Sequence, residues 1–178
     1  MPRSCNSATG ATRSTLIPVL LVLVSLSSTA YARSDLELRA YAGVFNTDAW
    51  LDNTESDALE VGVEFYLSPL EDTRIAPLIG TAANADDASW LYTGVRWGHF
   101  LGAGWQAAFS FALTFYNEGD SKPLGSDLEF RSGVEMAYGL EGGHALGAQF
   151  YHISNAGISN SNPGNNSLVF FYSIPIRP

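Results

Sequence analysis

Cysteine is nearly absent from this sequence. The chain has one, Cys5, and it lies within the first 32 residues. If those residues are removed during export, the remaining chain contains no cysteine. Disulfides, thiolate nucleophiles and thiolate metal sites are then excluded from residues 33–178. Such a chain must be held together by burial and backbone pairing alone.

Basic residues are also scarce, since nine Lys and Arg face eighteen Asp and Glu, for a formal net charge of −9. This balance argues against a nucleic-acid partner, because phosphates need neutralisation by Lys and Arg. The acids are concentrated in two predicted loops, and we expect them to be solvated loop tips without the ligand spacing of a cation site. They are Asp48, Asp52, Glu55 and Asp57 in one loop and Asp86 and Asp87 in the other.

Long apolar runs are limited to Leu16–Leu26, which is shorter than the roughly 20 residues that a membrane-spanning helix needs. Arg3 and Arg13 precede this run, and Ala30-Tyr31-Ala32 follows it with the small-residue pattern of a cleavage site. We therefore predict a signal peptide at 1–32 and one domain at 33–178. A retained N-terminal anchor is the alternative.

The rest of the chain alternates between apolar and polar residues, in pieces of about ten residues separated by Gly, Asp, Asn, Ser and Pro. This pattern predicts eight strands, near 36–45, 58–67, 76–83, 89–100, 104–116, 127–140, 144–155 and 167–176. Alternation alone does not distinguish a soluble sandwich, with its charges toward water, from a membrane barrel, with apolar side chains toward lipid and polar ones inside.

Three features favour the barrel. The strands are about 9–11 residues long, as a tilted crossing requires. Long polar connections, at 46–57, 117–126 and after 155, alternate with tight ones near 101–103 and 141–143, as outer loops alternate with periplasmic turns. Aromatic residues near strand ends resemble interfacial girdles: Trp90, Tyr92, Trp97, Phe100, Phe115, Tyr116 and Phe170 to Tyr172. The predicted fold is all-β, an eight-stranded antiparallel transmembrane β-barrel of the outer membrane.

Two polar residues share the apolar face of the seventh predicted strand. His152 and Ser154 have the same parity as Phe150, and their Cα atoms are roughly 6.6 Å apart at about 3.3 Å per residue. This spacing allows a His–Ser hydrogen bond, the core of an activated hydroxyl nucleophile. If both termini are periplasmic, this strand ends at the outer surface, and the pair faces the outer leaflet. A structural pair in the headgroup zone is the alternative.

The run from His152 to Ile158 (HISNAGI), followed by Asn162-Pro163-Gly164, resembles the signature of the PagL family of lipid A 3-O-deacylases. The resemblance implies an outer-membrane enzyme that hydrolyses an ester of lipid A in lipopolysaccharide, with no cofactor and no metal. It implies that Ser154 is the nucleophile and His152 the general base. It further implies that Asn155 and Gly157 stabilise the oxyanion, through a side-chain amide and a backbone N–H.

One position departs from the family. Members with an acidic triad have a Glu where this chain has Asn166, which shares parity with Leu168 on the last predicted strand. An amide oxygen can orient a histidine, but it does not stabilise an imidazolium as a carboxylate does. A working Ser-His-Asn triad, a slow Ser–His dyad and a barrel without activity all remain open. Glu129 and Asp127 are not candidates, because their parity directs them into the lumen.

Two other classes of function compete with the enzyme. One is a non-enzymatic small outer-membrane barrel with a structural or adhesion role. The other is a soluble, periplasmic lipocalin-like binder. The sequence also leaves open a homodimer. His99 and His144 flank predicted periplasmic turns, and we expect structural or solvated roles for both.

Overall fold

The computed structural model describes residues 36–50 and 57–176, apart from the side chains of residues 49 and 50. The predicted signal peptide lies outside the described residues. The strands are β1 (Leu36–Phe45), β2 (Ala58–Tyr66), β3 (Ile75–Asn84), β4 (Ser89–Gly102), β5 (Trp105–Asn117), β6 (Leu128–Gly139), β7 (Ala145–Ser154) and β8 (Asn165–Ile176). Two short 3₁₀ turns, η1 (Thr47–Trp50) and η2 (Glu141–Gly143), complete the described elements.

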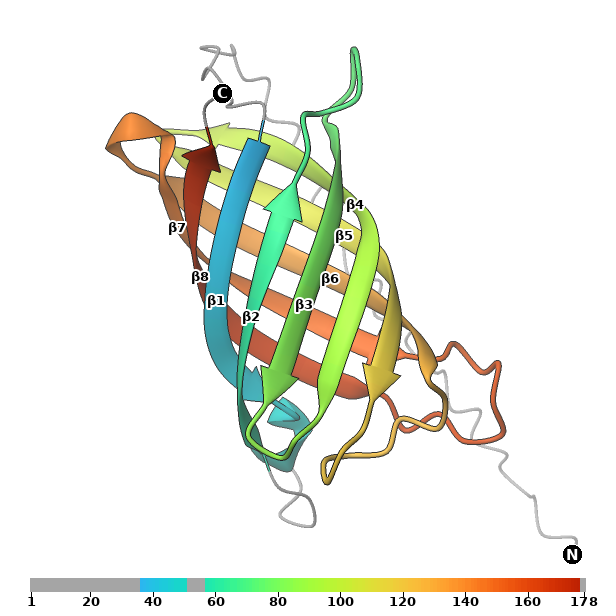
Figure 1. The fold of residues 1–178 in the computed structure, drawn as a ribbon. Helices are drawn as coiled ribbons and strands as arrows, with labels where there is room; N and C mark the ends of the chain where they lie inside the picture. The colour runs from blue at the N-terminus through green and yellow to red at the C-terminus, as the bar shows by residue number, and fades with distance from the viewer. Residues whose placement is uncertain (1–35, 51–56, 177–178) are drawn as a thin grey trace, which may run out of the picture.

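Each strand pairs antiparallel with its neighbour in the chain, and β8 pairs with β1, so the sheet closes into a barrel (Figure 1). Every strand bound lies within two residues of the predicted one. The eight-stranded antiparallel barrel predicted from the alternation is therefore confirmed. Among the described residues, no helix is long and apolar enough to cross a membrane.

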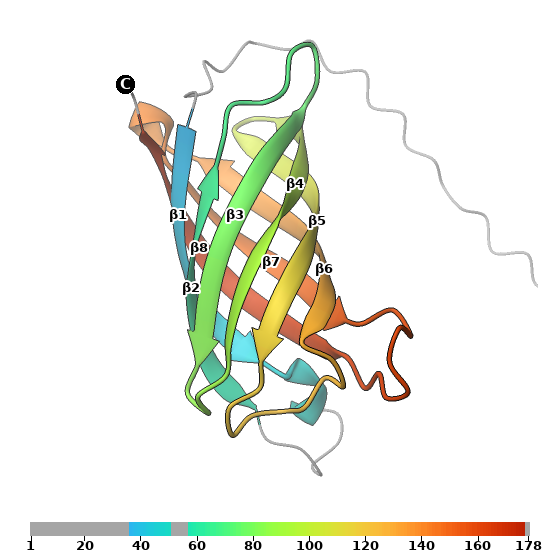
Figure 2. The same ribbon diagram turned by 45° about the vertical axis from the view of Figure 1, so that its right-hand side comes forward.

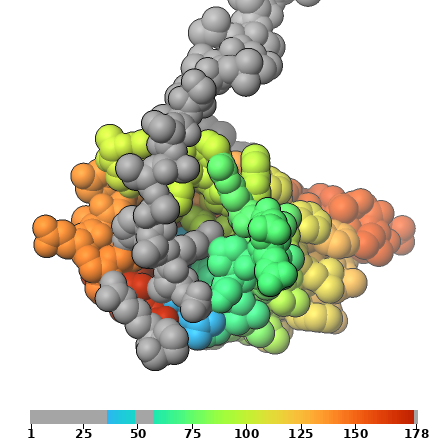
Figure 3. All heavy atoms as spheres, turned by 90° about the horizontal axis from the view of Figure 1, so that it is seen from above, coloured from blue at the N-terminus to red at the C-terminus, as the bar shows by residue number. Residues whose placement is uncertain are grey.

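The connections gather at two ends of the barrel. The β1–β2, β3–β4, β5–β6 and β7–β8 connections lie at one end, and the last of these projects sideways from the wall (Figures 1 and 2). Figure 3 views the opposite end, where the β2–β3, β4–β5 and β6–β7 connections lie around the rim. The start of β1 and the end of β8 are also at this second end. We call the first end the outer end and the second the periplasmic end.

The two faces of the wall are inverted relative to a soluble protein. On β6, Val134 and Met136 are about half exposed, while Glu129, Arg131 and Glu135 are buried inside the barrel. Leu, Val, Phe and Trp side chains continue this apolar exterior around the wall. A lipocalin-like binder would need an apolar interior, so this arrangement argues against that alternative and for a lipid-facing exterior.

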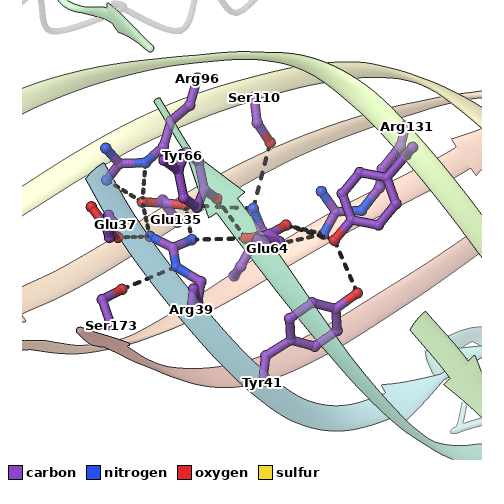
Figure 4. Close-up of polar contacts among 12 residues, drawn as sticks. Glu37, Arg39, Tyr41, Glu64, Tyr66, Arg96, Ser110, Arg131, Glu135 and Ser173 are labelled. Carbon is purple, nitrogen blue, oxygen red and sulfur yellow. Dashed lines mark hydrogen bonds and ion pairs between the residues drawn. The ribbon is translucent and has the colours of Figure 1, made fainter. Parts of the chain in front are cut away.

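The interior is filled by a buried network of charges. Arg39 binds Glu135 at 2.8 Å, Arg96 binds the same carboxylate, and Arg131 lies 3.4 Å from Glu64 (Figure 4). Arg131 contacts Glu64 and Gln149 on other strands rather than the acids on its own strand. This network leaves the narrow barrel packed with side chains.

The predicted aromatic girdle is wrong for four of its members. Trp90, Tyr92, Tyr116 and Phe171 are buried inside the barrel, whereas Trp97, Phe100, Phe115, Phe170 and Tyr172 lie on the exterior. Successive residues of a strand point to opposite faces, so neighbours such as Phe115 and Tyr116 cannot both face lipid. Inside the outer end, the rings of Trp90, Phe45 and Tyr116 pack on one another.

Candidate active site

The end of β7 carries the two candidate catalytic residues on its exterior face. His152 and Ser154 are half-buried, and the residues between and before them, Ile153 and Tyr151, are fully buried in the barrel. Because β7 runs toward the outer end, both side chains lie near the outer rim of the wall. The face and the end are those expected from the alternation and the topology.

Asn166 on β8 lies directly opposite His152 in the β7–β8 register. Its Oδ1 is 2.8 Å from His152 Nδ1, so the two side chains form a hydrogen bond across the strands. Asn166, at the position where the resemblance implies a Glu, therefore contacts the imidazole.

A carboxylate that the sequence did not nominate lies behind Asn166. The Asn166 amide nitrogen donates to Oδ1 and Oδ2 of Asp48 at 2.8 and 3.0 Å. An ionised carboxylate only accepts hydrogen bonds, so the NH₂ group of Asn166 must face Asp48 and its oxygen must face His152. A neutral imidazole in this contact has its proton on Nδ1 and donates it to Asn166 Oδ1. Nε2 then keeps a free lone pair, as a general base requires.

Asp48 was expected to be a solvated loop tip, and that prediction is wrong. It lies in η1, directly after β1, and the neighbouring Thr47 hydroxyl donates to the backbone oxygen of Asn166 at 3.2 Å. The physical reason is the closure of the barrel. Phe45 at the end of β1 pairs with Ser167 on β8, so the residues after Phe45 lie beside Asn166. That neighbourhood was available only from the pairing of the first and last strands.

Gly164 holds the other edge of the imidazole. Its φ is +66°, and a Cβ added there would lie 2.8 Å from His152 Cε1 and 3.2 Å from Nε2. Glycine is required at this position both for the left-handed backbone and for the close approach of the ring. The Asn-Pro-Gly part of the signature therefore shapes the pocket of the histidine.

The Ser154 hydroxyl forms no hydrogen bond to another side chain or backbone group in the part of the chain that the structure describes. Ser154 lies next to Phe130 in the β6–β7 register and is half-buried. Hydrogen bonds between nucleophile and base are often long before substrate binds and tighten only in the complex. The geometry is therefore compatible with a Ser–His pair, with Ser154 one position beyond the oriented imidazole on the same face.

Asn155 and Gly157 have other bonds in this structure. The Asn155 amide is fully buried and donates to the backbone oxygens of Leu124 and Ser161 at 3.0 and 2.8 Å. Its Oδ1 accepts from the Gly157 N–H at 3.0 Å. Both donors that the resemblance assigns to the oxyanion thus hold the β7–β8 loop in its present conformation.

The residues that the sequence set aside lie away from the pair. Glu129 is buried in the interior, on the opposite face of β6 from Phe130. At the periplasmic end, His144 bonds to the Tyr172 hydroxyl at 2.9 Å and His99 bonds to Arg74.

Comparison with known families gives one match. The family model described as "Lipid A 3-O-deacylase (PagL)" matches residues 28–175. No curated protein matches the chain.

Solved structures share the fold at low identity. The crystal structure of the outer membrane enzyme PagL has a TM-score of 0.59 and 18% identity, covering 79% of this chain and 99% of that one. A de novo designed transmembrane β-barrel has a TM-score of 0.58 and 9% identity, covering 81% and 98%. Neisserial surface protein A has a TM-score of 0.52 and 10% identity, covering 80% and 98%. Nothing in these comparisons supports the homodimer that the sequence leaves open.

Proposed function

The chain belongs to the PagL family of lipid A 3-O-deacylases and is an eight-stranded β-barrel of the outer membrane, and from this premise we propose that it hydrolyses the ester-linked 3-hydroxyacyl chain at the 3-position of lipid A. The observation that carries the proposal is the hydrogen bond between His152 Nδ1 and Asn166 Oδ1 at 2.8 Å, beside Ser154. It supplies what a serine esterase needs, a histidine held in the tautomer whose free nitrogen takes a proton.

In the proposed reaction, Ser154 Oγ attacks the ester carbonyl while His152 Nε2 takes the hydroxyl proton. Collapse of the tetrahedral intermediate breaks the ester bond, and His152 returns the proton to the departing sugar oxygen. Water, deprotonated by the same histidine, then cleaves the acyl-serine. The products are a free 3-hydroxy fatty acid and 3-O-deacylated lipid A, and Ser154 regains its proton.

We assign stabilisation of the oxyanion to Asn155 and Gly157, as the family resemblance implies. Both donors bond within the loop in the substrate-free structure, so the assignment requires that substrate binding redirects them. A donor aimed at the developing oxyanion is typically worth a few kcal/mol of barrier.

The position of the pair supports a lipid substrate. His152 and Ser154 lie on the exterior face of the wall near its outer end, above exposed Phe150 and Phe170. A lipid that lies in the outer leaflet reaches this face without leaving the membrane, whereas a soluble ester does not. We further propose that residues 1–32 are removed during export, so that the mature protein begins at Arg33. N-terminal sequencing of the membrane-inserted protein tests this.

Mass spectrometry of lipid A tests the proposed activity, with cells expressing the wild-type protein beside Ser154→Ala. We expect the wild-type protein to remove one 3-hydroxyacyl group and the variant to lose turnover on the order of 10⁶-fold, as nucleophile removal does in a serine protease. Heat-modifiable migration on gels verifies that both barrels are folded. Unchanged lipid A with the folded wild-type protein would overturn the proposal.

A non-enzymatic barrel with a structural or adhesion role is the competing function. The observations in its favour are the neutral Asn166 at the acidic position and the loop bonds of Asn155 and Gly157. The same experiment separates the two, because a structural barrel leaves lipid A unchanged with either serine or alanine at position 154.

A further inference from the structure

We propose that Asp48 is a positioning residue of this site, and that it performs through Asn166 the orienting role that a Glu performs directly in the family. This inference rests on the proposed function. It starts from the two hydrogen bonds that the Asn166 amide donates to the Asp48 carboxylate, at 2.8 and 3.0 Å.

The first step of the argument is the direction of the amide. An asparagine beside a histidine can present either its oxygen or its NH₂ group, and the two choices select opposite imidazole tautomers. With the NH₂ group facing His152, Nδ1 would become the acceptor and Nε2 would carry the proton. Nε2 could then not accept the proton of Ser154. Asp48 excludes this arrangement because an ionised carboxylate only accepts hydrogen bonds, so the NH₂ group of Asn166 must face it.

The second step is the charge. Asn166 alone provides no negative charge to the imidazolium that forms when His152 takes a proton. Asp48 places a carboxylate one amide group away, and charge-assisted bonds to it polarise the amide so that its oxygen becomes a stronger acceptor. Hydrogen bonds thus link Asp48, Asn166 and His152, and Ser154 lies two residues beyond His152 on the same face of β7.

The third step is the attachment of Asp48. η1 follows β1 directly, and the Thr47 hydroxyl holds it to the Asn166 backbone oxygen at 3.2 Å. Asp48 is half-buried. The carboxylate therefore belongs to a segment fixed on β8 and not to a free loop tip, unlike exposed Asp120 in the β5–β6 loop.

The test exchanges the charge between positions 48 and 166. Four proteins are compared in detergent with lipopolysaccharide as substrate: wild type, Asp48→Asn, Asn166→Glu and the double variant. Asp48→Asn lets the amide of residue 166 turn, and we expect kcat to fall about 10- to 100-fold with little change in KM, as for a lost bond to a charged group. Asn166→Glu alone places two carboxylates together and also lowers kcat.

The double variant restores one carboxylate and one amide in exchanged positions, and we expect its kcat to return to within about tenfold of wild type. Asp120→Asn, the matched control, removes an acid from another outer loop and leaves kcat unchanged. Gel migration reports the folded fraction of each variant.

A second readout does not depend on activity. ¹⁵N-histidine labelling reports which ring nitrogen of His152 is protonated, and substitution of His99 and His144 by Gln identifies their signals. We expect the Nδ1–H tautomer in wild type and loss of that preference in Asp48→Asn. Wild-type kcat together with an unchanged tautomer in Asp48→Asn would overturn the role of Asp48, and so would a double variant no faster than Asp48→Asn. Wild-type protein that releases no hydroxy acid would instead overturn the proposed function, and the tautomer comparison would still decide the role of Asp48.

Discussion

At the scale of single residues, the candidate site depends more on how the Asn166 amide and the His152 ring are oriented than on their charge. Asn166 accepts the hydrogen bond from His152 Nδ1 only when its side-chain oxygen faces the imidazole. The Asp48 carboxylate determines this orientation of the amide. Gly164 sets the position of the same ring from the other side, because no Cβ fits against it. The position of the imidazole is therefore fixed by the acceptor Asn166 Oδ1 at Nδ1 and by the close approach of Gly164 near Nε2.

Substitution Gly164→Ala tests this boundary. The added Cβ would lie 2.8 Å from His152 Cε1, closer than van der Waals contact allows, so the ring must move. A displacement of about 1 Å at a reacting group can cost about 10²-fold in rate, and we expect kcat to fall by that order. The measurement is release of 3-hydroxy acid per folded molecule.

Gly142→Ala is the control for backbone strain, since Gly142 also has a positive φ, +75°, but lies at the periplasmic end. The kcat of Gly142→Ala should equal that of wild type. Its free energy of unfolding should fall by about as much as that of Gly164→Ala, because both substitutions place a Cβ at a positive φ. Equal kcat in both variants would show that Gly164 does not position the ring.

At the scale of elements, β7 keeps its two faces separate. Its inward Tyr151 hydroxyl donates to Glu60 at 2.6 Å and its inward Gln149 bonds Arg131, which fixes the register of the strand. A slip of one residue would turn His152 and Ser154 into the lumen. The β7–β8 loop that follows is fastened by the buried Asn155 side chain, which makes three hydrogen bonds.

Asn155→Ala should release this loop. Loss of the three bonds removes the attachment to Leu124 and Ser161, and we expect a loss of about 1–3 kcal/mol of local stability. Proteinase K should then cut within 155–164 of the folded protein faster than in wild type. Asn160→Ala, an exposed position in the same loop, should leave the cleavage rate unchanged. If proteinase K cleaves Asn155→Ala no faster than wild type, the Asn155 amide does not hold the loop in place.

At the scale of the whole molecule, the barrel combines a lipid-facing exterior with an interior of paired charges. Glu135 is the centre of that interior, since it accepts from both Arg39 and Arg96 and is buried. The catalytic candidates lie on the opposite face of the wall. The buried charges and the proposed catalytic residues therefore lie on opposite faces of the barrel wall.

Glu135→Gln should destabilise the barrel without changing its chemistry. It leaves two buried guanidinium groups without their shared carboxylate, and breaking a buried ion pair from one side costs about 3–5 kcal/mol. The free energy of unfolding, from urea titration followed by tryptophan fluorescence, should fall by this amount while kcat per folded molecule stays constant. Glu141→Gln, at an exposed position in η2, is the control. An unchanged unfolding midpoint in Glu135→Gln would contradict the central role of this carboxylate.

The sequence by itself determined the strands, the shared face of His152, Ser154 and Phe150, and the end of the barrel at which His152 and Ser154 lie. These properties follow from local rules: alternation has a period of two, and strand length and turn composition are read within a few residues. The family signature added the expected chemistry of the segment from His152 to Gly164. The same local rules gave Asn166 the parity of Leu168, and the β7–β8 register of the structure places it opposite His152.

Only the tertiary structure decided that Asp48 joins this site and that Trp90 and Tyr92 face the interior. Asp48 and Asn166 are far apart in the sequence, and no local pattern pairs them. They meet because β1 and β8 close the ring, which places the residues after Phe45 beside the start of β8. Closure is a property of all eight strands together, and it makes Asp48, which the local pattern predicts to be solvated, a partner of Asn166.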